Sequence, residues 1–219
     1  RLARSWIGLA EEGDVIYLPG NVPSDFISRL TGAGLPRVEF TNQWPDGKQV
    51  SEFQLIPWGW SDAVSQIAAT KGFQGEVSDR RAVQTVNART FSFQLEQEWG
   101  LTLPGSARVE TLAELESALR DLQDVQGAQE IEWVVKANFS MSARERMRGQ
   151  GSLLPSQIRG WAEKRLSQGQ PLFLEPWVKR TVEVGLQFEI PREGASQLMG
   201  IAPLLCDERG QYRGSRIVV

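Results

Sequence analysis

The sequence predicts a small N-terminal α/β domain followed by a larger α+β unit built on an antiparallel sheet. Before residue 85, short apolar runs alternate with helical patterns, as in parallel strands joined by helices. From residue 172 to the end, strand-like runs are separated by turn residues, which favours antiparallel pairing. The length of 219 residues allows two small domains, which we place at residues 1–85 and 86–219.

In the N-terminal domain we expect strands and helices in alternation. The expected strands cover residues 14–19, 38–40 and 53–58, and the expected helices cover residues 23–30 and 62–71. Ser24 or Asp25 is the expected cap of the first helix, and Ser61 is the expected cap of the second. Small and branched apolar residues share one face of the second helix, namely Ala63, Val64, Ile67 and Ala68.

Three helices are predicted in the second unit. The first covers residues 89–99 and ends at Gly100, and the third begins at Pro155. The second opens on a capping box, in which Thr111 and Glu114 satisfy each other's free backbone amides. The apolar positions at helical spacing are Phe91, Leu95 and Trp99 in the first helix, with Phe93 beside them, Leu112, Leu115, Leu119 and Leu122 in the second, and Ile158, Trp161 and Ala162 in the third.

The strands of the second unit follow these helices or lie between them. They are expected at residues 131–137, 172–175, 182–190, 198–205 and 213–219. Residues 138–151 are predicted to form a polar loop, because hydroxyl and charged side chains dominate them and two glycines end them. The chain stops at Val219 within a run that resembles the middle of a strand, and we expect it to be a fragment.

Two absences narrow the chemistry that this chain can perform. The sequence has no histidine, which excludes Ser-His-Asp triads, His-ligated zinc and imidazole proton transfer. Cys206 is the only cysteine, which excludes an intrachain disulfide and a Cys-x-x-Cys metal site. The remaining carboxylates, lysines, arginines, hydroxyls and amides suit phosphoryl transfer, which depends on positioning and charge neutralisation.

Charge and hydropathy exclude further classes of protein. A net charge of −3 provides no basic field for nucleic acid, and no apolar run approaches the ~20 residues of a membrane helix. Glu11, Glu12 and Asp14 follow the basic N-terminus, where a signal peptide needs an apolar core. We therefore expect a cytoplasmic protein without nucleic-acid or membrane partners.

Lys136 and the residues after it suggest a phosphate site. Lys136 ends an apolar strand, and a buried lysine must be paired or face an anionic ligand, because desolvating its charge alone is costly. The alternative is a lysine on the solvent side of an edge strand. Ser140 and Ser142 lie in the next loop, which could close over phosphates or could be an ordinary solvated loop.

The run Leu-Phe-Leu-Glu-Pro-Trp-Val, residues 172–178, is a strand that ends in a proline. We expect backbone groups after Glu175 to leave the ladder, so that free amides and carbonyls beside Trp177 could hold a flat heterocycle. The alternative is a turn between strands with a tryptophan in the core. Glu183 lies on the following strand, where it could also be an ordinary solvent-facing glutamate.

Taken in order, these motifs resemble the ATP-grasp superfamily. The resemblance rests on Arg89 at a helix start, the Val-Val-Lys strand with its serine-containing loop, the Leu-Phe-Leu-Glu-Pro-Trp-Val run and the Glu-Val-Gly-Leu-Gln-Phe run. It covers residues 85–190 in detail. It implies that an N-terminal pre-ATP-grasp α/β domain precedes an incomplete ATP-grasp domain, whose two subdomains hold ATP between them.

The resemblance also implies roles for individual residues. Arg89 matches a basic residue that contacts phosphate, and Lys136 resembles the strand lysine that bridges the α- and β-phosphates. Ser140 and Ser142 belong to the flexible loop over the phosphates, which is usually richer in glycine in the family. The cationic pair Lys136 and Arg89 would be catalytic, because it neutralises charge on the phosphates.

The adenosine contacts are implied in the same way. Glu175 resembles the hinge glutamate near the adenine amino group, and the Pro176 carbonyl and Val178 amide would meet the edge of the base. Trp177 would flank the base, and Glu183 resembles the acid that holds the ribose hydroxyls.

The implied activity is an ATP-dependent carboxylate–amine or carboxylate–thiol ligase that acts through an acyl phosphate on a small-molecule carboxylate. Family members bind Mg²⁺ through an acidic residue and a Glu-x-Asn pair, a pattern that does not occur before Val219, so we expect these ligands beyond it. One alternative is a non-catalytic nucleotide-binding or protein-interaction module on the same scaffold. Another is a plain α/β scaffold whose Trp44, Trp58 and Trp60 bind a protein partner.

Overall fold

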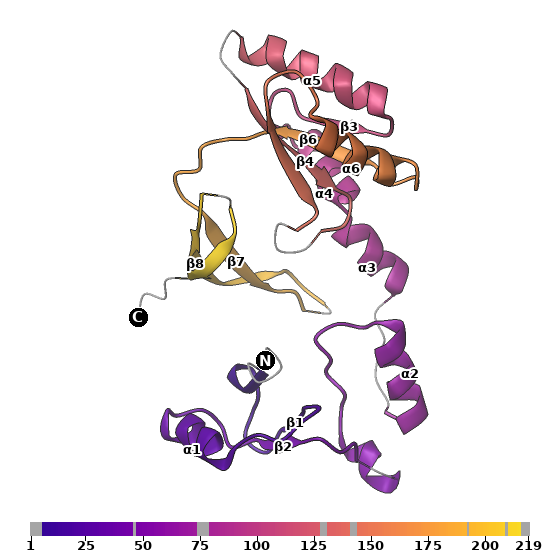
Figure 1. Ribbon diagram of the computed structural model, residues 1–219. Coiled ribbons are helices and arrows are strands. Elements are labelled where there is room, and N and C mark those ends of the chain that lie inside the picture. The colour runs from indigo at the N-terminus through magenta and orange to yellow at the C-terminus, as the bar shows by residue number, and fades with distance from the viewer. Residues whose placement is uncertain are drawn as a thin grey trace. The chain divides into compact units, whose positions relative to one another are not determined.

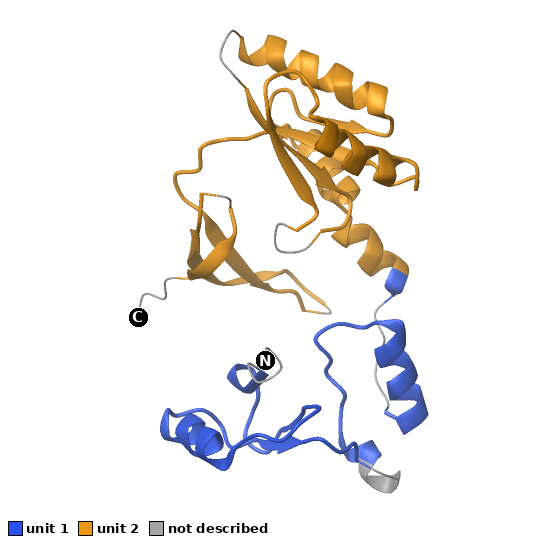
Figure 2. Cartoon of the chain, in the orientation of Figure 1, with its two compact units in different colours: residues 1–80 blue, residues 81–219 orange. Residues whose placement is uncertain are grey.

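The computed structural model describes residues 6–45, 47–73, 79–127, 131–140, 144–191, 193–208 and 210–215. It divides into two compact units, residues 1–80 and 81–219 (Figure 2). The sequence-based boundary after residue 85 falls inside helix α3 (Arg80–Asn87) and stays a prediction.

The elements of unit 1 alternate between strand and helix (Figure 1). They are β1 (Val15–Tyr17), α1 (Ser24–Gly32), β2 (Glu39–Thr41), a 3-10 helix (Gly47–Glu52) and α2 (Asp62–Lys71). Strands β1 and β2 pair in parallel, which confirms the predicted parallel arrangement. The start of α2 is also confirmed, because the Ser61 hydroxyl accepts a hydrogen bond from the Val64 amide at 3.3 Å.

Two predictions for unit 1 are wrong. Helix α1 begins at Ser24, so its capping residue is Pro23. Ser24 and Asp25, the predicted caps, both lie inside the helix. Residues 53–58, all of which are described, form no strand. Ile56 and Trp58 are 67% and 86% exposed, and no strand among the described residues pairs with this apolar run.

Three aromatic contacts are described for the tryptophans of unit 1. Trp44 stacks on Tyr17 with ring centroids 4.0 Å apart, and its edge meets Phe73 at 5.7 Å. The exposed Trp58 meets Trp6 edge-on at 5.8 Å. These contacts leave Trp58 on the surface, where a large aromatic ring is available for contact.

The described part of unit 2 contains two sheets and four helices (Figure 1). Its elements are α3, α4 (Arg89–Glu98), β3 (Ala107–Val109), α5 (Leu112–Gln126), β4 (Glu132–Ala137), β5 (Arg146–Gln150), α6 (Ser156–Leu166), β6 (Leu172–Pro176), β7 (Val184–Glu189), β8 (Gln197–Cys206) and β9 (Tyr212–Ser215). The larger sheet has the order β3-β6-β4-β5 and the smaller one β7-β8-β9, with antiparallel pairing throughout. The predicted fold class, mixed α/β with an antiparallel sheet, is confirmed.

Helices α5 and α6 cover one face of the larger sheet and enclose the main core with it. The core consists of Val109, Leu115, Ala118, Leu119, Leu122, Ile131, Trp133, Val135, Ala137, Ile158, Ala162, Leu172 and Leu174. The predicted capping box is present at the start of α5, where the Glu114 amide donates to the Thr111 hydroxyl at 3.2 Å and the Thr111 amide donates to the Glu114 carboxylate at 3.3 Å. Of the leucine stripe predicted for this helix, Leu115, Leu119 and Leu122 are buried and Leu112 is partly buried.

Strand β5 corrects the prediction of a polar loop over residues 138–151. Residues 146–150 pair antiparallel with β4, with Lys136 opposite Arg146 and Trp133 opposite Gly149. The prediction is wrong because it interprets the charged side chains as the mark of a loop. They occupy one face of the strand, and only the other face meets the core. Residues 141–143 lie outside the described residues.

Gly149 is required where β5 passes the ring of Trp133. A Cβ atom at this position would lie 2.2 Å from two carbons of the fully buried indole. We therefore expect Gly149→Ala to lower the free energy of unfolding by about 2 kcal/mol, as overpacked core positions do. Gly160, exposed in α6 with no atom near its would-be Cβ, is the matched control, and Gly160→Ala should stabilise by about 0.5–1 kcal/mol. Urea unfolding measures both, and a neutral Gly149→Ala would contradict the described contact.

The opposite face of the larger sheet is partly covered by helix α4. Phe93 is buried and meets Phe173 with ring centroids 5.4 Å apart. Of the apolar residues predicted for this helix, Phe93 is the buried one, whereas the inclusion of Trp99 is wrong, because its side chain is 67% exposed. The α4 helix covers only part of this face, and the uncovered part is polar.

The smaller sheet matches the predicted run of antiparallel strands. Strands β7 and β8 agree with the expected ranges, and β9 covers the first part of the expected strand, whose residues 216–219 lie outside the described residues. Within the described ranges, no helix is both long and apolar enough to cross a membrane.

Candidate functional site

The candidate site lies on the face of the larger sheet that α5 and α6 do not cover. Residues opposite one another in an antiparallel pair share a face, and side chains alternate between faces along each strand. Lys136 is opposite Arg146, and Val134 is opposite both Arg148 and Glu175. Because Trp133 and Val135 point into the core, these charged side chains all belong to the other face.

Lys136, Arg89 and Glu175 meet in a triad on this face. Lys136 Nζ lies 2.5 Å from Glu175 Oε2, and Arg89 Nη2 forms an ion pair with Glu175 Oε1. The side chains of both cations are 24% exposed and that of Glu175 is 11% exposed. One buried carboxylate thus faces two cations, and the triad carries a net positive charge in a poorly solvated position, which favours an anionic ligand.

The surroundings also act on the ionisation of Lys136. Desolvation by burial lowers the pKa of Lys136 below the ordinary 10.5, and the nearby cations Arg89 and Arg146 lower it further. The Glu175 carboxylate acts in the opposite direction through its charge and its hydrogen bond. An additional anion beside the Lys136 ammonium would therefore stabilise its protonated form.

A second group of cations surrounds the ring of Trp177. The guanidinium carbons of Arg148, Arg180 and Arg146 lie 3.8, 5.1 and 5.4 Å from the ring centroid. Desolvation, followed by the neighbouring charges of Arg180 and Arg148, lowers the pKa of Arg146. The cluster is partly neutralised, since Arg148 pairs with Glu132 at 3.2 Å.

Strand β6 does not end where its proline predicts. Pro176 is the last residue of the strand, opposite Trp133, and the next amide, that of Trp177, donates to the Glu132 carbonyl at 2.8 Å. The expectation that backbone groups after Glu175 leave the ladder is therefore wrong for Pro176 and for the Trp177 amide. A proline removes only its own N–H, so the following donor can still bond to β4.

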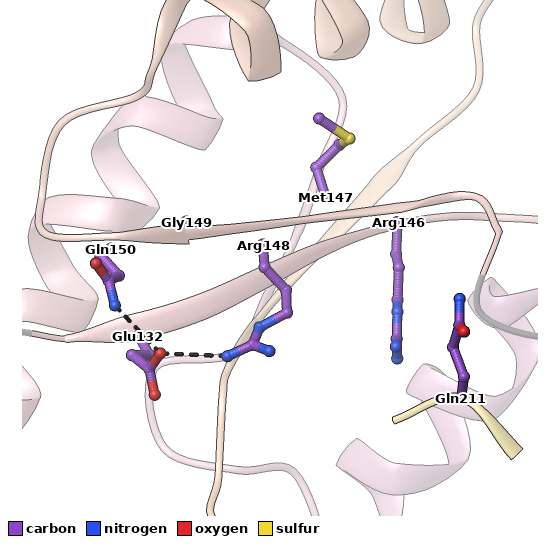
Figure 3. A pocket seen from close by; sticks show the side chains of 7 residues that line it. All are labelled: Glu132, Arg146, Met147, Arg148, Gly149, Gln150 and Gln211. Atoms are coloured by element: carbon purple, nitrogen blue, oxygen red, sulfur yellow. Dashed lines mark hydrogen bonds and ion pairs between the residues drawn. The ribbon is translucent and has the colours of Figure 1, made fainter. Parts of the chain in front are cut away.

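An open pocket of about 510 Å³ lies beside these arginines (Figure 3). Its lining residues are Glu132, Arg146, Met147, Arg148, Gly149, Gln150 and Gln211. Arg146 and Arg148 point to the same side of β5, whereas Met147 points to the other side. The polar lining thus comes from one face of β5, together with Glu132 of β4 and Gln211.

Glu183 lies in a separate pair of contacts near Trp177. It forms an ion pair with Arg180. A hydrogen bond with the Cys206 thiol, then Arg180, lowers the pKa of Glu183, and the same hydrogen bond raises the pKa of Cys206. The Glu183 carboxylate thus has two described partners, the Arg180 guanidinium and the Cys206 thiol.

The structure brings some of the predicted site residues together and leaves others apart. Arg89, Lys136 and Glu175 share one triad, whereas Trp177 and Glu183 are joined through Arg180. Ser140 is exposed at the start of the loop after β4, and Val178 is 47% exposed. Ser142 lies outside the described residues.

Arg146 and Arg148 were missed as candidate site residues. The signal that could have found them is the alternation of Arg146, Arg148 and Gln150 with Met147 and Gly149, which has the period of two that marks a strand with one polar face. Their approach to Trp177 depends on the pairing of β5, β4 and β6, which local sequence does not determine.

No family model matches the chain, and no curated protein matches it. Among solved structures, it is similar to N5-carboxyaminoimidazole synthetase from Staphylococcus aureus complexed with ADP, with 12% identity and a TM-score of 0.48 over 80% of this chain and 45% of that chain. It is also similar to an ADP complex of N5-carboxyaminoimidazole ribonucleotide synthetase (15% identity, TM-score 0.46, 84% of this chain and 47% of that chain). A D-cycloserine synthetase matches with 18% identity and a TM-score of 0.39, over 77% of this chain and 60% of that chain.

All three are ATP-grasp enzymes, the superfamily that the sequence resembles. The chain spans about half the length of the first two structures. With TM-scores of 0.39 to 0.48, the likeness carries no argument about function, which has to come from the residues of the chain itself.

Proposed function

We propose that the polar face of the larger sheet binds ATP, with the phosphates at Arg89 and Lys136. The observation that carries this proposal is the convergence of these two cations on the single buried carboxylate of Glu175. Phosphate groups are stabilised by fixed cations in poorly solvated positions, where charge-assisted hydrogen bonds are strong.

The two cations keep donors for a ligand while they pair with Glu175. A lysine ammonium has three N–H donors and an arginine guanidinium has five, and Glu175 accepts one hydrogen bond from each residue. A phosphate oxygen can therefore bind both cations without first displacing the carboxylate.

We assign the remaining contacts as the family resemblance implies. The Glu175 carboxylate, the Pro176 carbonyl and the Val178 amide would meet the adenine edge, Trp177 would flank the base and Glu183 would accept from the ribose hydroxyls. One observation supports this assignment. Arg180 pairs with Glu183 and its guanidinium carbon lies 5.1 Å from the centroid of the Trp177 ring, so the residues proposed for the ribose and the base share a neighbour.

At the level of the reaction, we propose an ATP-dependent ligase that activates a small-molecule carboxylate. A carboxylate oxygen would attack the γ-phosphorus and ADP would leave. An amine or thiol would then attack the acyl carbon of the acyl phosphate, and inorganic phosphate would leave. Arg89 and Lys136 would hold the phosphate charge during the first step.

The family resemblance also implies Mg²⁺. Among the described residues there is no group of three or more His, Cys, Asp or Glu side chains that could hold a metal ion. These residues do not fit a Mg²⁺ site, and no step is assigned to the metal. The cytoplasmic location likewise stays a prediction from the sequence.

Calorimetric titration of the intact gene product tests the proposed nucleotide site. We expect Mg-ATP and Mg-ADP to bind and AMP to bind much more weakly, because the proposed site acts on the phosphate chain. Absence of binding by Mg-ATP would contradict the proposal. Binding without ADP formation from any carboxylate and amine or thiol offered would instead favour the non-catalytic module.

The lowered pKa of Lys136 predicts how ATP binding depends on pH. The ammonium loses its proton below the ordinary lysine pKa of 10.5, so we expect ATP affinity to fall with rising pH before that value is reached. Over the same window the unfolded chain holds more protons than the folded one, so the free energy of unfolding rises with pH. Calorimetry from about pH 7 to about pH 10 measures the affinity. Lys136→Arg should remove the dependence, and an equal decline in that variant would contradict the assignment.

A further inference from the structure

We infer that Asn138 is a positioning residue that ties the start of helix α4 to the end of strand β4, and so sets Arg89 against Lys136. The Asn138 Oδ1 atom accepts hydrogen bonds from the Thr90 amide at 3.0 Å and from the Thr90 hydroxyl at 2.9 Å. Its backbone carbonyl accepts from the Arg89 amide at 2.8 Å. Three hydrogen bonds therefore join two elements whose contacting residues, Thr90 and Asn138, are 48 positions apart.

Asn138 caps the N-terminus of α4 from outside the helix. The residue at the cap of α4 is Ala88, which has no side-chain acceptor. A capping side chain accepts from the second or third amide of a helix, and Thr90 is the second residue of α4. The acceptor for this amide thus comes from the sheet rather than from the helix's own sequence, and without it a partly buried donor would lose its partner.

The hydrogen bonds of Asn138 affect the triad because they join the two elements that carry its cations, α4 with Arg89 and β4 with Lys136. Arg89 is the first residue of α4, and Lys136 stands two residues before Asn138 on β4. The pairing of β4 with its neighbours fixes Lys136, and Phe93 packs the body of α4 on the sheet at Phe173. The first turn, which carries Arg89, is held to the sheet by the Asn138 hydrogen bonds.

The expected effect of Asn138 on nucleotide affinity rests on the proposed nucleotide site. Its expected effect on the Arg89–Glu175 ion pair does not depend on nucleotide. The informative variants are Asn138→Ala, which removes the side-chain acceptor, and Asn138→Asp, which keeps an acceptor oxygen and adds a charge that helix N-termini favour. Asn87→Ala is the matched control, because the exposed Asn87 side chain donates to the Val83 carbonyl at 2.9 Å, within α3.

The first measurement is made on the intact, nucleotide-free gene product by NMR. In Asn138→Ala we expect the amide of Thr90, whose side-chain acceptor is removed, to exchange with solvent at least about tenfold faster, and the Arg89 guanidinium signal to move to that of a free side chain. Asn138→Asp and Asn87→Ala should match the wild type. Unchanged exchange and an unchanged guanidinium signal in Asn138→Ala would overturn the inference. Should that variant not fold, Thr90→Val, which removes one of the three hydrogen bonds, should show the same change in milder form.

The second measurement is a double-mutant cycle on Mg-ATP affinity. We expect Asn138→Ala to weaken binding about tenfold and Asn138→Asp to stay within about twofold of the wild type. In an Arg89→Ala background, Asn138→Ala should add less than about twofold, because its effect passes through Arg89. Fully additive effects would overturn the inference. If the wild type binds no nucleotide while the NMR result holds, the proposed function fails and the positioning role of Asn138 stands.

Discussion

Replacing Lys136 with alanine is expected to weaken Mg-ATP binding by about 10- to 100-fold, which corresponds to the about 1.5–3 kcal/mol of a hydrogen bond to a charged group. The variant should remain folded, because Glu175 keeps its ion pair with Arg89 and no uncompensated buried charge is left. Calorimetry measures the affinity and thermal unfolding checks the fold.

Lys164→Ala is the matched control for this experiment. Lys164 is exposed in α6, on the helix layer that covers the other face of the sheet. Its removal deletes the same charge from the same unit and should leave affinity unchanged. An affinity of Lys136→Ala equal to that of the wild type would remove Lys136 from the site.

Glu175→Gln is expected to have the largest effect on stability, lowering the free energy of unfolding by about 2–4 kcal/mol. The substitution keeps the shape of the side chain but leaves Arg89 and Lys136 as like charges in a poorly solvated position. This effect is slightly smaller than for a fully buried pair, because both cations retain some contact with solvent.

The control for Glu175→Gln is Glu132→Gln on the same sheet face. The ion pair of Glu132 with Arg148 is more exposed, and its loss should change the free energy of unfolding by less than about 1 kcal/mol. Urea unfolding compares the two variants. Equal and small effects would mean that the triad is as well solvated as a surface pair, which would contradict its described burial.

Local patterns in the sequence predicted the features that depend on neighbouring residues. The capping box at Thr111, the leucine stripe of α5 and the cap at Ser61 all involve partners within a few positions, and all are present. Lys136 was also identified from local context, because a charge at the end of an apolar strand needs a partner whatever the fold.

The features that the sequence did not predict depend on pairing between distant segments. The polar residues of β5 resemble a loop in the sequence, and the strand is recognised only from its pairing with β4. Glycine is required at position 149 because the ring of Trp133 lies close to it. The cap that Asn138 provides to α4 crosses 48 positions, and no local motif reports it. The same holds for the triad itself, in which Glu175 joins two cations from α4 and β4.

The face bearing Arg89, Lys136 and Glu175 is proposed to bind the phosphates of ATP, and a crystal structure of the intact gene product with Mg-ADP would show the contacts themselves. We expect phosphate oxygens within hydrogen-bond distance of Lys136 Nζ and the Arg89 guanidinium, with the base toward Trp177. Nucleotide bound elsewhere, with the triad unchanged and out of contact, would contradict it.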